Sequence, residues 1–340
     1  MCIRDSADSD DYEAIKNFVK QTKVVLSAAG PFARYSTKVV EACVECKTHY
    51  TDITGENHWV KGLIDRFHEK AALDGTRIVP SCGYDSIPSD LGVYFSVTRS
   101  KQPVSHVTVY HSAKGGASGG TTETMFTMGP LPKEMRDPFL LNPKDSVSET
   151  QKSKSFDDFS VKPIPGTDAF SGMGLMSFAN TRVVRRSSAL FDLNQKSYGP
   201  DFTFKELGSY PSKAAARITS LVLMSAFLVI ATPLRHLVRP LLPKPGDGPD
   251  KEARDNGWFR GLFIAELEDG SEKRFEIYGS GDPGYKSTSK MVCEAALTLA
   301  FSDDLPFGNG FGGVLTSAVG LGDPLISRLI KAGITFEVLS

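Results

Sequence analysis

The sequence has few cysteines, almost no net charge and no signal peptide, and each shortage excludes a class of protein. Five cysteines, an odd number in 340 residues, are too few for a disulfide scaffold and indicate a reducing, intracellular compartment. Lysine and arginine number 39 against 40 aspartates and glutamates, so no excess positive charge is present to attract nucleic acid. The first residues, MCIRDSADSDDY, are acidic and polar and lack the apolar core of a signal peptide.

The first hundred residues alternate between extended and helical patterns. Three short apolar runs are typical of buried strands, at residues 23–32, 49–53 and 77–81. Helical periodicity precedes and separates them, at residues 11–20, 35–45 and 59–73. Strands and helices that alternate at this spacing predict a parallel sheet with right-handed crossovers.

The rest of the chain has a different pattern. HVTVYHSA (106–113) and LFIAELEDGSEKRFEIYG (262–279) alternate between apolar and polar residues, and residues 268–271 supply a hairpin turn. We expect antiparallel strands with one solvated face. The predicted fold class is therefore α/β plus α+β, with a Rossmann domain in residues 7–100 and a mixed or antiparallel-sheet substrate domain in residues 101–340. This is the layout of a dehydrogenase.

One segment of the second region carries no charge. It reads ITSLVLMSAFLVIATPL, residues 218–234, and basic residues flank it on both sides. A membrane-spanning helix needs about 20 apolar residues, so this shorter run, interrupted by Pro233, is marginal for a span. Three interpretations stay open: insertion into a membrane surface or lipid monolayer, a buried or subunit-interface helix, and a true span.

A G-x-G-x-x-G motif at Gly279, Gly281 and Gly284 has the spacing of a dinucleotide-binding loop. In a true fingerprint, a continuous apolar strand precedes the loop, and the helix after it leads to a second parallel strand. Here the preceding strand alternates, and the helix at 292–301 is followed by a predicted loop. We therefore expect a glycine-rich turn near the substrate crevice.

Cys43 and Cys46 form a C-x-x-C pair close in sequence to His49 and His58, a composition that zinc sites use. The pair lies near the carboxyl end of the helix at 35–45. A helix dipole raises a thiol pKa at that end, which disfavours a redox role as well. We predict structural cysteines and no metal site.

Polar and small residues follow each of the three predicted parallel strands. Gly30 and Pro31 follow the first, Gly55 and Glu56 the second, and the loop GYDSIPSDLG, residues 83–92, the third. Ligands bind outside the carboxyl ends of the strands in open parallel sheets, so the three loops should converge on one site. Well-capped turns are the alternative interpretation of the same residues.

Four stretches of the sequence are distinctive: VVLSAAGPFARYSTKVVEAC, HYTDITGENHW, HEKAALDGTRIVPSCGYDSIPSDLG and GGVLTSAVGLGDPLISRLIKAGITFEVLS. Together they resemble the saccharopine dehydrogenase-like oxidoreductase family, which includes the trans-acting enoyl reductases of lipid biosynthesis. The resemblance runs from about residue 10 to the C-terminus. It implies NADP or NAD as the cofactor, held by the Rossmann domain, while the α+β domain offers the acceptor.

The resemblance also implies roles for individual residues. Cofactor contacts fall to Ala29, Gly30 and Pro31 along the dinucleotide and to Asp52, Gly55 and Glu56 near its nicotinamide end. Substrate contacts fall to Phe32, Ser86 and Pro88, and Asp85 is the candidate catalytic acid or base. Hydride transfer requires mainly alignment and exclusion of water, so Asp85 is the one side chain to which we assign chemistry.

The family's first strand and glycine-rich loop precede the point at which this chain begins. The resemblance therefore predicts an N-terminally truncated Rossmann domain that lacks its first βαβ unit. The first hypothesis is an NAD(P)H-dependent reductase of a lipid-like acceptor. The alternative is a non-catalytic protein of a membrane or lipid-droplet surface that keeps the fold, because the segment 218–234 looks like that of the family's membrane- and lipid-droplet-associated members. A homodimer is left open.

Overall fold

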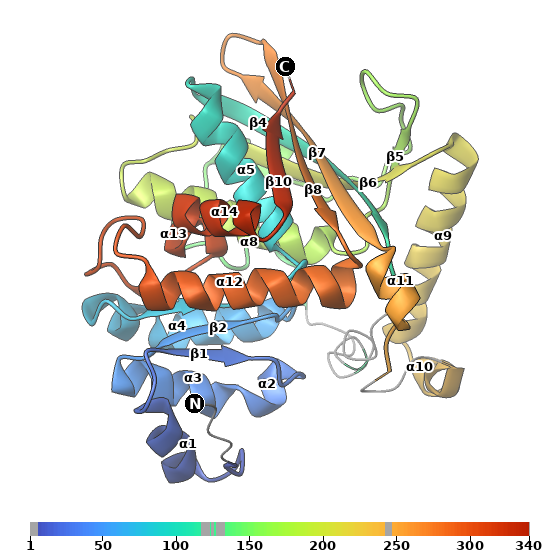
Figure 1. The fold of residues 1–340 in the computed structure, drawn as a ribbon. Coiled ribbons are helices and arrows are strands. Elements are labelled where there is room, and N and C mark those ends of the chain that lie inside the picture. Colours follow the sequence, from blue (N-terminus) through green and yellow to red (C-terminus); the bar gives the residue numbers. More distant parts are fainter. Residues whose placement is uncertain (1–5, 117–122, 124–125, 127–132, 242–246, 340) are drawn as a thin grey trace.

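A computed structural model describes residues 6–116, 123, 126, 133–241 and 247–339, and Figure 1 shows how their helices and strands are arranged. The strands are β1 Val24–Ser27, β2 His49–Asp52, β3 Arg77–Val79, β4 Val104–Lys114, β5 Phe170–Gly172, β6 Thr203–Tyr210, β7 Trp258–Leu267, β8 Glu272–Ser280, β9 Gly313–Val314 and β10 Ile334–Val338. The helices are α1 Tyr12–Val19, α2 Phe32–Tyr35, α3 Thr37–Cys46, α4 Asn57–Leu73, α5 Ile87–Ser100, α7 Glu149–Lys154, α8 Ser177–Leu193, α9 Lys213–Ile230, α10 Arg235–Val238, α11 Lys251–Asp255, α12 Thr288–Phe301, α13 Ser317–Gly320 and α14 Gly322–Lys331.

The first sheet has the parallel topology that the sequence predicts. Its order is β1-β2-β3-β9, and every neighbouring pair is parallel. The register places Ser27 beside Asp52, so the carboxyl ends of β1 and β2 lie at the same edge. The strand, helix, strand pattern of the first hundred residues is therefore confirmed.

The fourth strand of this sheet comes from near the other end of the chain. β9 pairs with β3, with Arg77 beside Gly313. The Arg77 side chain reinforces this contact, because its guanidinium donates to the carbonyls of Pro306, Gly308 and Gly320 at 2.6–2.8 Å. The division into residues 7–100 and 101–340 stays a prediction, but the second segment contributes a strand to the first sheet.

The second sheet has six strands in the order β10-β8-β7-β4-β6-β5. β7 and β8 form the hairpin predicted around residues 268–271, with Glu266 beside Glu272 next to the turn. One pair differs from the antiparallel expectation, because β4 and β6 are parallel. The chain between these two strands includes α8, and a crossover of that length lets a strand return in the same direction.

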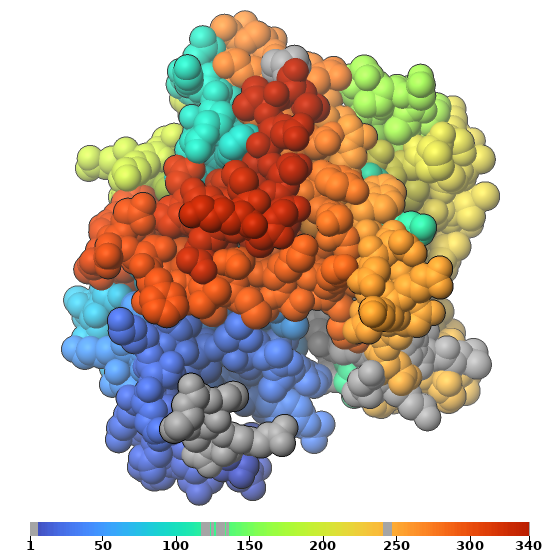
Figure 2. Space-filling model, viewed as in Figure 1, coloured from blue at the N-terminus to red at the C-terminus, as the bar shows by residue number. Residues whose placement is uncertain are grey.

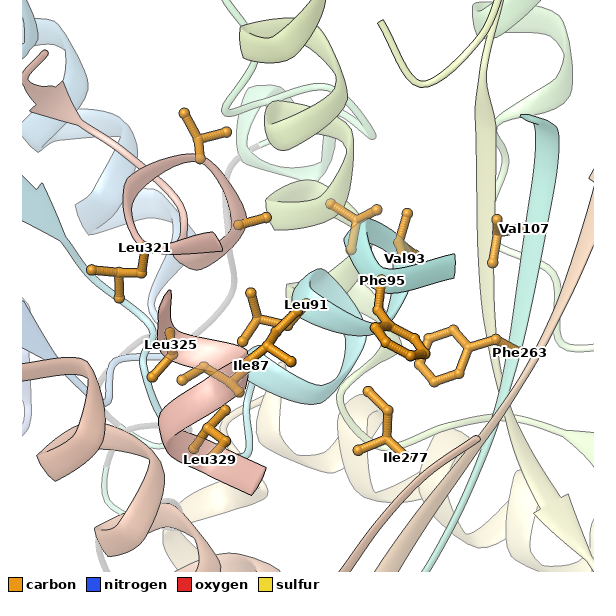
Figure 3. Close-up of a cluster of buried hydrophobic side chains, with 14 of the residues drawn as sticks. Ile87, Leu91, Val93, Phe95, Val107, Phe263, Ile277, Leu321, Leu325 and Leu329 are labelled. Atoms are coloured by element: carbon orange, nitrogen blue, oxygen red, sulfur yellow. The ribbon is translucent and has the colours of Figure 1, made fainter. Parts of the chain in front are cut away.

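Helix α5 joins the two sheets through one hydrophobic core. Figure 3 shows Ile87 and Leu91 of α5 on the side of Leu325 and Leu329, and Phe95 beside Phe263 of β7. The helix lies so close to this strand that a side chain at Gly92 would put its Cβ 2.1 Å from the Phe263 ring. The first turn of α5 is therefore held between the parallel sheet and the six-stranded sheet.

Helix α12 covers one face of the parallel sheet, where it contacts β1 and β2. In Figure 2 its orange residues lie directly against the blue N-terminal region. Helices α3 and α4 contact strands of the same sheet, and α3 lies below β1 and β2 in Figure 1, on the side away from α12, so helices cover the sheet on both sides. This is the layered arrangement of a doubly wound fold.

The hydrophobic segment forms most of helix α9, which stands at the edge of the molecule beside β5 and β6 (Figure 1). Only Ala216 and Ser220 of this helix are buried, whereas Leu221 and Leu228 are 67% and 68% exposed. The interpretation as a helix buried within this chain is therefore wrong. Among the helices of the described ranges, α9 alone is long and apolar enough to cross a membrane.

Candidate active site

The loops that follow β1, β2 and β3 converge at one edge of the parallel sheet, as the sequence predicts. Cys82 of the third loop donates its backbone N–H to the carbonyl of Asp52 at 2.7 Å. Phe32 and Ala33 of the first loop donate theirs to the side chain of Glu56. The predicted cofactor and substrate residues therefore belong to one connected group of loops.

Glu56 ties the first two loops together. Its carboxylate accepts from the N–H groups of Phe32 at 2.8 Å and Ala33 at 3.0 Å, which are free donors at the start of α2. The side chain is buried. A cofactor would therefore meet the loop that Glu56 shapes, whereas the carboxylate itself is already occupied.

Asp52 has a comparable supporting position under the second and third loops. One carboxylate oxygen accepts from the N–H of Thr54 at 3.0 Å and from that of Ser81 at 2.9 Å. The residue is fully buried, and this burial raises the pKa of its carboxyl to about 7. The predicted contact of Asp52 and Glu56 with the cofactor stays a prediction, and in the structure both side chains hold the loops in place.

The surface of the first loop is open and made of small residues. Ala29 and Gly30 are exposed, whereas Pro31 and Phe32 are buried, with the Phe32 ring 5.9 Å from that of Trp59. Across the site, a Cβ at Gly55 would meet only the Met176 side chain, at 3.5 Å. Small residues at the carboxyl ends of parallel strands fit a dinucleotide, because its ribose and nicotinamide can lie against the backbone.

Asp85 differs from the other predicted residues because its carboxylate has no assigned partner. It is half-buried and forms no hydrogen bond or ion pair with another residue that the structure describes. Burial, and to a smaller extent the nearby Glu206 carboxylate, raise the pKa of Asp85 to about 7. The structure thus places at the site edge a carboxyl group whose acid form is present at neutral pH.

Ser86 and Pro88 are buried at the start of α5. The Ser86 hydroxyl donates to the side-chain oxygen of Asn180 in α8 at 2.9 Å, and Pro88 occupies the first turn of the helix. Their predicted contact with substrate stays a prediction; in this loop Tyr84 and Asp85 are half-buried, whereas Ser86 and Pro88 are buried.

A second polar cluster lies beside this loop, and it was not predicted from the sequence. It consists of Ser89, His111, Asn180 and Glu206, which come from α5, β4, α8 and β6. A glutamate that shares the buried face of β6 with Phe204 is the one local signal that could have indicated it. The four residues are distant in sequence, so only the folded chain brings them together.

The G-x-G-x-x-G segment is a turn, as expected. Gly279 ends an antiparallel strand, and the buried Asp282 carboxylate accepts from the N–H groups of Tyr285 and Lys286 at 3.0 Å each. These donors are therefore not available to a phosphate. The turn does lie at the site, because the Tyr84 N–H donates to the Thr288 hydroxyl at 3.0 Å.

The helix after this turn departs from the prediction. α12 is followed by a loop and then by β9, a strand of the parallel sheet, where the sequence predicted only loop.

In the described ranges, no three histidine, cysteine, aspartate or glutamate side chains are grouped to hold a metal ion. Cys43 is buried, and burial raises the pKa of its thiol well above the usual range.

Comparisons with known proteins agree with this architecture. A family model described as the saccharopine dehydrogenase NADP binding domain matches residues 2–79. A Mycobacterium tuberculosis (strain ATCC 25618 / H37Rv) protein with the provisional name trans-acting enoyl reductase is 33% identical, over 98% of this chain and 84% of that protein. The trans-acting enoyl reductase of Mycobacterium ulcerans (strain Agy99) is 31% identical, over 96% of this chain and 83% of its own length.

A solved structure shows the same fold. Saccharopine dehydrogenase (L-Glu forming) from Saccharomyces cerevisiae has a TM-score of 0.50 at 13% identity, covering 98% of this chain and 88% of that chain. At such identity the likeness concerns the fold alone, while the mycobacterial relatives carry the family assignment. The chain belongs to the saccharopine dehydrogenase-like oxidoreductases, the family that includes the trans-acting enoyl reductases, and is an oxidoreductase with an NADP-binding domain.

Proposed function

We propose that this protein uses NADPH to reduce a carbon–carbon double bond conjugated to a carbonyl group in an apolar, lipid-like acceptor. The observation that carries the proposal is Asp85, a carboxyl group without a hydrogen-bond partner in the described chain, at the carboxyl end of the parallel sheet. Reduction of such a bond needs a hydride and then a proton. The names of the mycobacterial relatives favour the same reaction class.

The chain's residues divide these two tasks. When bound, NADPH supplies the hydride, which forms a new C–H bond at the carbon β to the carbonyl and moves the π electrons toward the carbonyl oxygen. Asp85 then donates its proton to the α carbon and is left as a carboxylate, which solvent reprotonates. Because burial keeps the pKa of Asp85 near 7, the acid form is available at neutral pH.

The cofactor is held, in this proposal, against the small residues of the first two loops. Ala29, Gly30 and Gly55 provide backbone surface without long side chains, and Pro31 fixes the turn between them. Asp52 and Glu56 hold these loops from below through the hydrogen bonds that they accept. Substrate would then approach past Phe32, Ser86 and Pro88 on the side of Asp85.

Apolar side chains lead from this site toward α9, which favours an apolar acceptor. Met176 faces Gly55, and the next-but-one residue, Phe178, packs edge-on against Phe227 of α9 with ring centroids 5.9 Å apart. Phe178 is partly exposed and also contacts Phe159 at 5.3 Å. An acyl chain could lie along these rings with its polar end near Asp85.

The exposed apolar surface of α9 supports a second candidate function, a non-catalytic protein of a membrane or lipid-droplet surface. Helix α9 begins at Lys213 and is followed by Arg235 and Arg239, so basic groups flank its apolar surface. An apolar helix flanked by cations can insert into an anionic lipid surface. The same helix could equally attach an active reductase to the membrane that holds its substrate.

The test uses the purified chain, NADPH and the N-acetylcysteamine thioesters of crotonic acid and of a long-chain homologue. We expect NADPH oxidation that depends on the thioester and is faster with the long-chain one. A rise in melting temperature with NADPH, by mass action, checks binding separately. NADPH binding without any thioester reduction contradicts the proposed reaction, and the absence of both favours the non-catalytic alternative.

A further inference from the structure

We propose that Glu206 is a positioning residue for this reaction: its buried carboxylate, fixed by Ser89 and Asn180, keeps the neighbouring Asp85 in its protonated form. The inference rests on the proposed function, in which Asp85 is the proton donor. It adds a residue of the six-stranded sheet to a site otherwise built by the parallel sheet.

The Glu206 carboxylate is held from two sides. The Ser89 hydroxyl donates to Oε2 at 2.7 Å, and the Asn180 amide donates to Oε1 at 2.9 Å. The other end of the same amide accepts from Ser86 at 2.9 Å. Since Ser86 directly follows Asp85, the chain of hydrogen bonds connects Glu206 to the loop that carries the proposed acid.

His111 completes the cluster without adding a charge. Its Nε2 lies 2.9 Å from the Ser89 hydroxyl, and its neighbours across the sheet are Gly208 and Gly261, which leave room for the ring. Burial lowers the pKa of His111 to about 4, so the ring is neutral at pH 7. Because Ser89 gives its one hydrogen to Glu206, Nε2 must carry the proton and donate to Ser89.

The cationic side chains that share a small cavity with Glu206 contact other groups. Lys205 and Arg185 line the same small cavity as Glu206. Lys205 lies 3.8 Å from Asp158, while the Arg185 guanidinium donates to the carbonyls of Pro138 and Phe204. Asp157, which also lines the cavity, is paired with Arg182 in α8.

Tyr84, the neighbour of Asp85, also carries a titratable group, a phenol that burial keeps neutral by raising its pKa far above the usual range. The negative charge of Glu206 therefore acts on Asp85, and the ionisation of the two carboxyl groups is coupled.

Hydrogen bonding decides which of the two carries the charge. Donors stabilise a carboxylate, and Glu206 receives two of them, whereas Asp85 receives none from the described residues. Burial raises the pKa of both groups, and the negative charge of Glu206 contributes to the rise for Asp85; both pKa values lie at about 7. As the pair loses its first proton, Glu206 becomes the anion and Asp85 keeps its proton to higher pH.

The experiment measures the titration of Asp85 by carbon NMR of labelled aspartate carboxyls in the full chain without cofactor. Asp85→Asn identifies the signal. In Glu206→Gln, we expect the Asp85 midpoint to fall by about one pH unit, since removing a neighbouring negative charge favours ionisation. In the reductase assay, the fall of kcat at high pH should move down by the same amount with KM unchanged.

Asp158→Asn is the matched control, because it removes an acid from the same cavity that has no hydrogen bond to this cluster; the Asp85 midpoint should stay in place. If Glu206→Gln does not fold, Ser89→Ala takes its place. Losing that donor raises the pKa of Glu206, so the Asp85 midpoint should again fall, by less.

The proposed roles of Asp85 and Glu206 can be contradicted separately. A reductase rate that Asp85→Asn leaves at the wild-type value overturns the role of Asp85 in the proposed function. An Asp85 midpoint that stays unchanged or rises in Glu206→Gln, or in Ser89→Ala where that variant replaces it, overturns the role of Glu206 whatever the rate.

Discussion

The two sheets of this protein present different chemistry to the same site. The parallel sheet ends in exposed small residues, Ala29 and Gly30, and its carboxylates, Asp52 and Glu56, accept hydrogen bonds from the loops around them. The six-stranded sheet instead buries Glu206 and His111, whose ionisation burial perturbs. In the proposed function, the parallel sheet therefore supplies a surface for the cofactor, and the six-stranded sheet supplies the electrostatic environment for proton transfer.

The first turn of α5 lies where these contributions meet. Asp85 precedes this helix, Ser89 binds Glu206, and Asp90 accepts from the Ser317 hydroxyl and the Ala318 N–H at 2.8 Å each. One turn of helix therefore contacts the parallel sheet's loops, the second sheet and the C-terminal segment. Small displacements of this turn would disturb all three.

The largest effect is expected from Asp85→Asn. If Asp85 donates the proton, kcat should fall about 10²–10⁴-fold while NADPH binding is unchanged. The acid form exists below a pKa of about 7, so wild-type kcat should fall as pH rises through that value, and the variant should lose this dependence. Asp303→Asn, an exposed residue elsewhere, is the control and should keep the wild-type rate.

Gly30→Val tests the surface that the parallel sheet is proposed to offer the cofactor. A branched side chain on the exposed first loop should obstruct the surface proposed for the dinucleotide and raise the Kd for NADPH at least about tenfold, a loss of about 1.4 kcal/mol. Calorimetric titration measures it. Gly310→Val is the matched control, because a Cβ there meets nothing within 4 Å. Equal affinities in the two variants would remove the first loop from the cofactor site.

Glu56→Ala should lower the free energy of unfolding markedly. Its effect on the affinity of the folded protein for NADPH should be smaller. The N–H groups of Phe32 and Ala33 lose their acceptor, and a buried unsatisfied donor costs about 1–3 kcal/mol. Urea unfolding should show a loss of about 2 kcal/mol. The exposed Glu337→Ala should lie within about 0.5 kcal/mol of wild type. A stable Glu56→Ala that fails to bind NADPH would instead indicate direct contact with the cofactor.

The smallest effect on the fold is expected from Leu221→Asp with Leu228→Asp on α9. Both side chains are exposed, so the free energy of unfolding should change by about 0.5 kcal/mol or less for each. Flotation with vesicles of anionic phospholipid should be lost if α9 attaches the protein to lipid. Ile330→Asp, a change of the same kind at a half-exposed position on α14, should leave flotation intact. Unchanged flotation in the α9 variant would remove the lipid-surface proposal.

Local patterns were enough to predict much of the fold. Three of the four strands of the parallel sheet, the helix α4 and the β7–β8 hairpin follow from periodicity and turn residues within single segments. Asp85 was a candidate site residue because it lies in the loop that follows the third parallel strand. The family resemblance supplied its chemical role.

Other features depend on contacts between distant segments, and the sequence does not show these. β9 has two residues and is a strand only because Arg77 and β3 lie beside it. Glu206 contacts Ser89 across 117 positions of the chain, and no pattern around either residue indicates the other. The exposure of α9 was likewise open, because an uncharged helix has the same sequence whether it is buried or faces outward.

The most direct measurement of the central claim is the reduction of an α,β-unsaturated N-acetylcysteamine thioester with NADPH in heavy water. The account predicts a product with one deuterium at the α carbon, delivered through Asp85, and only protium from NADPH at the β carbon. Asp85→Asn should form the same product more slowly. Deuterium at the β carbon, or no product at saturating NADPH, would contradict the claim that the two sheets together form a hydride and proton transfer site.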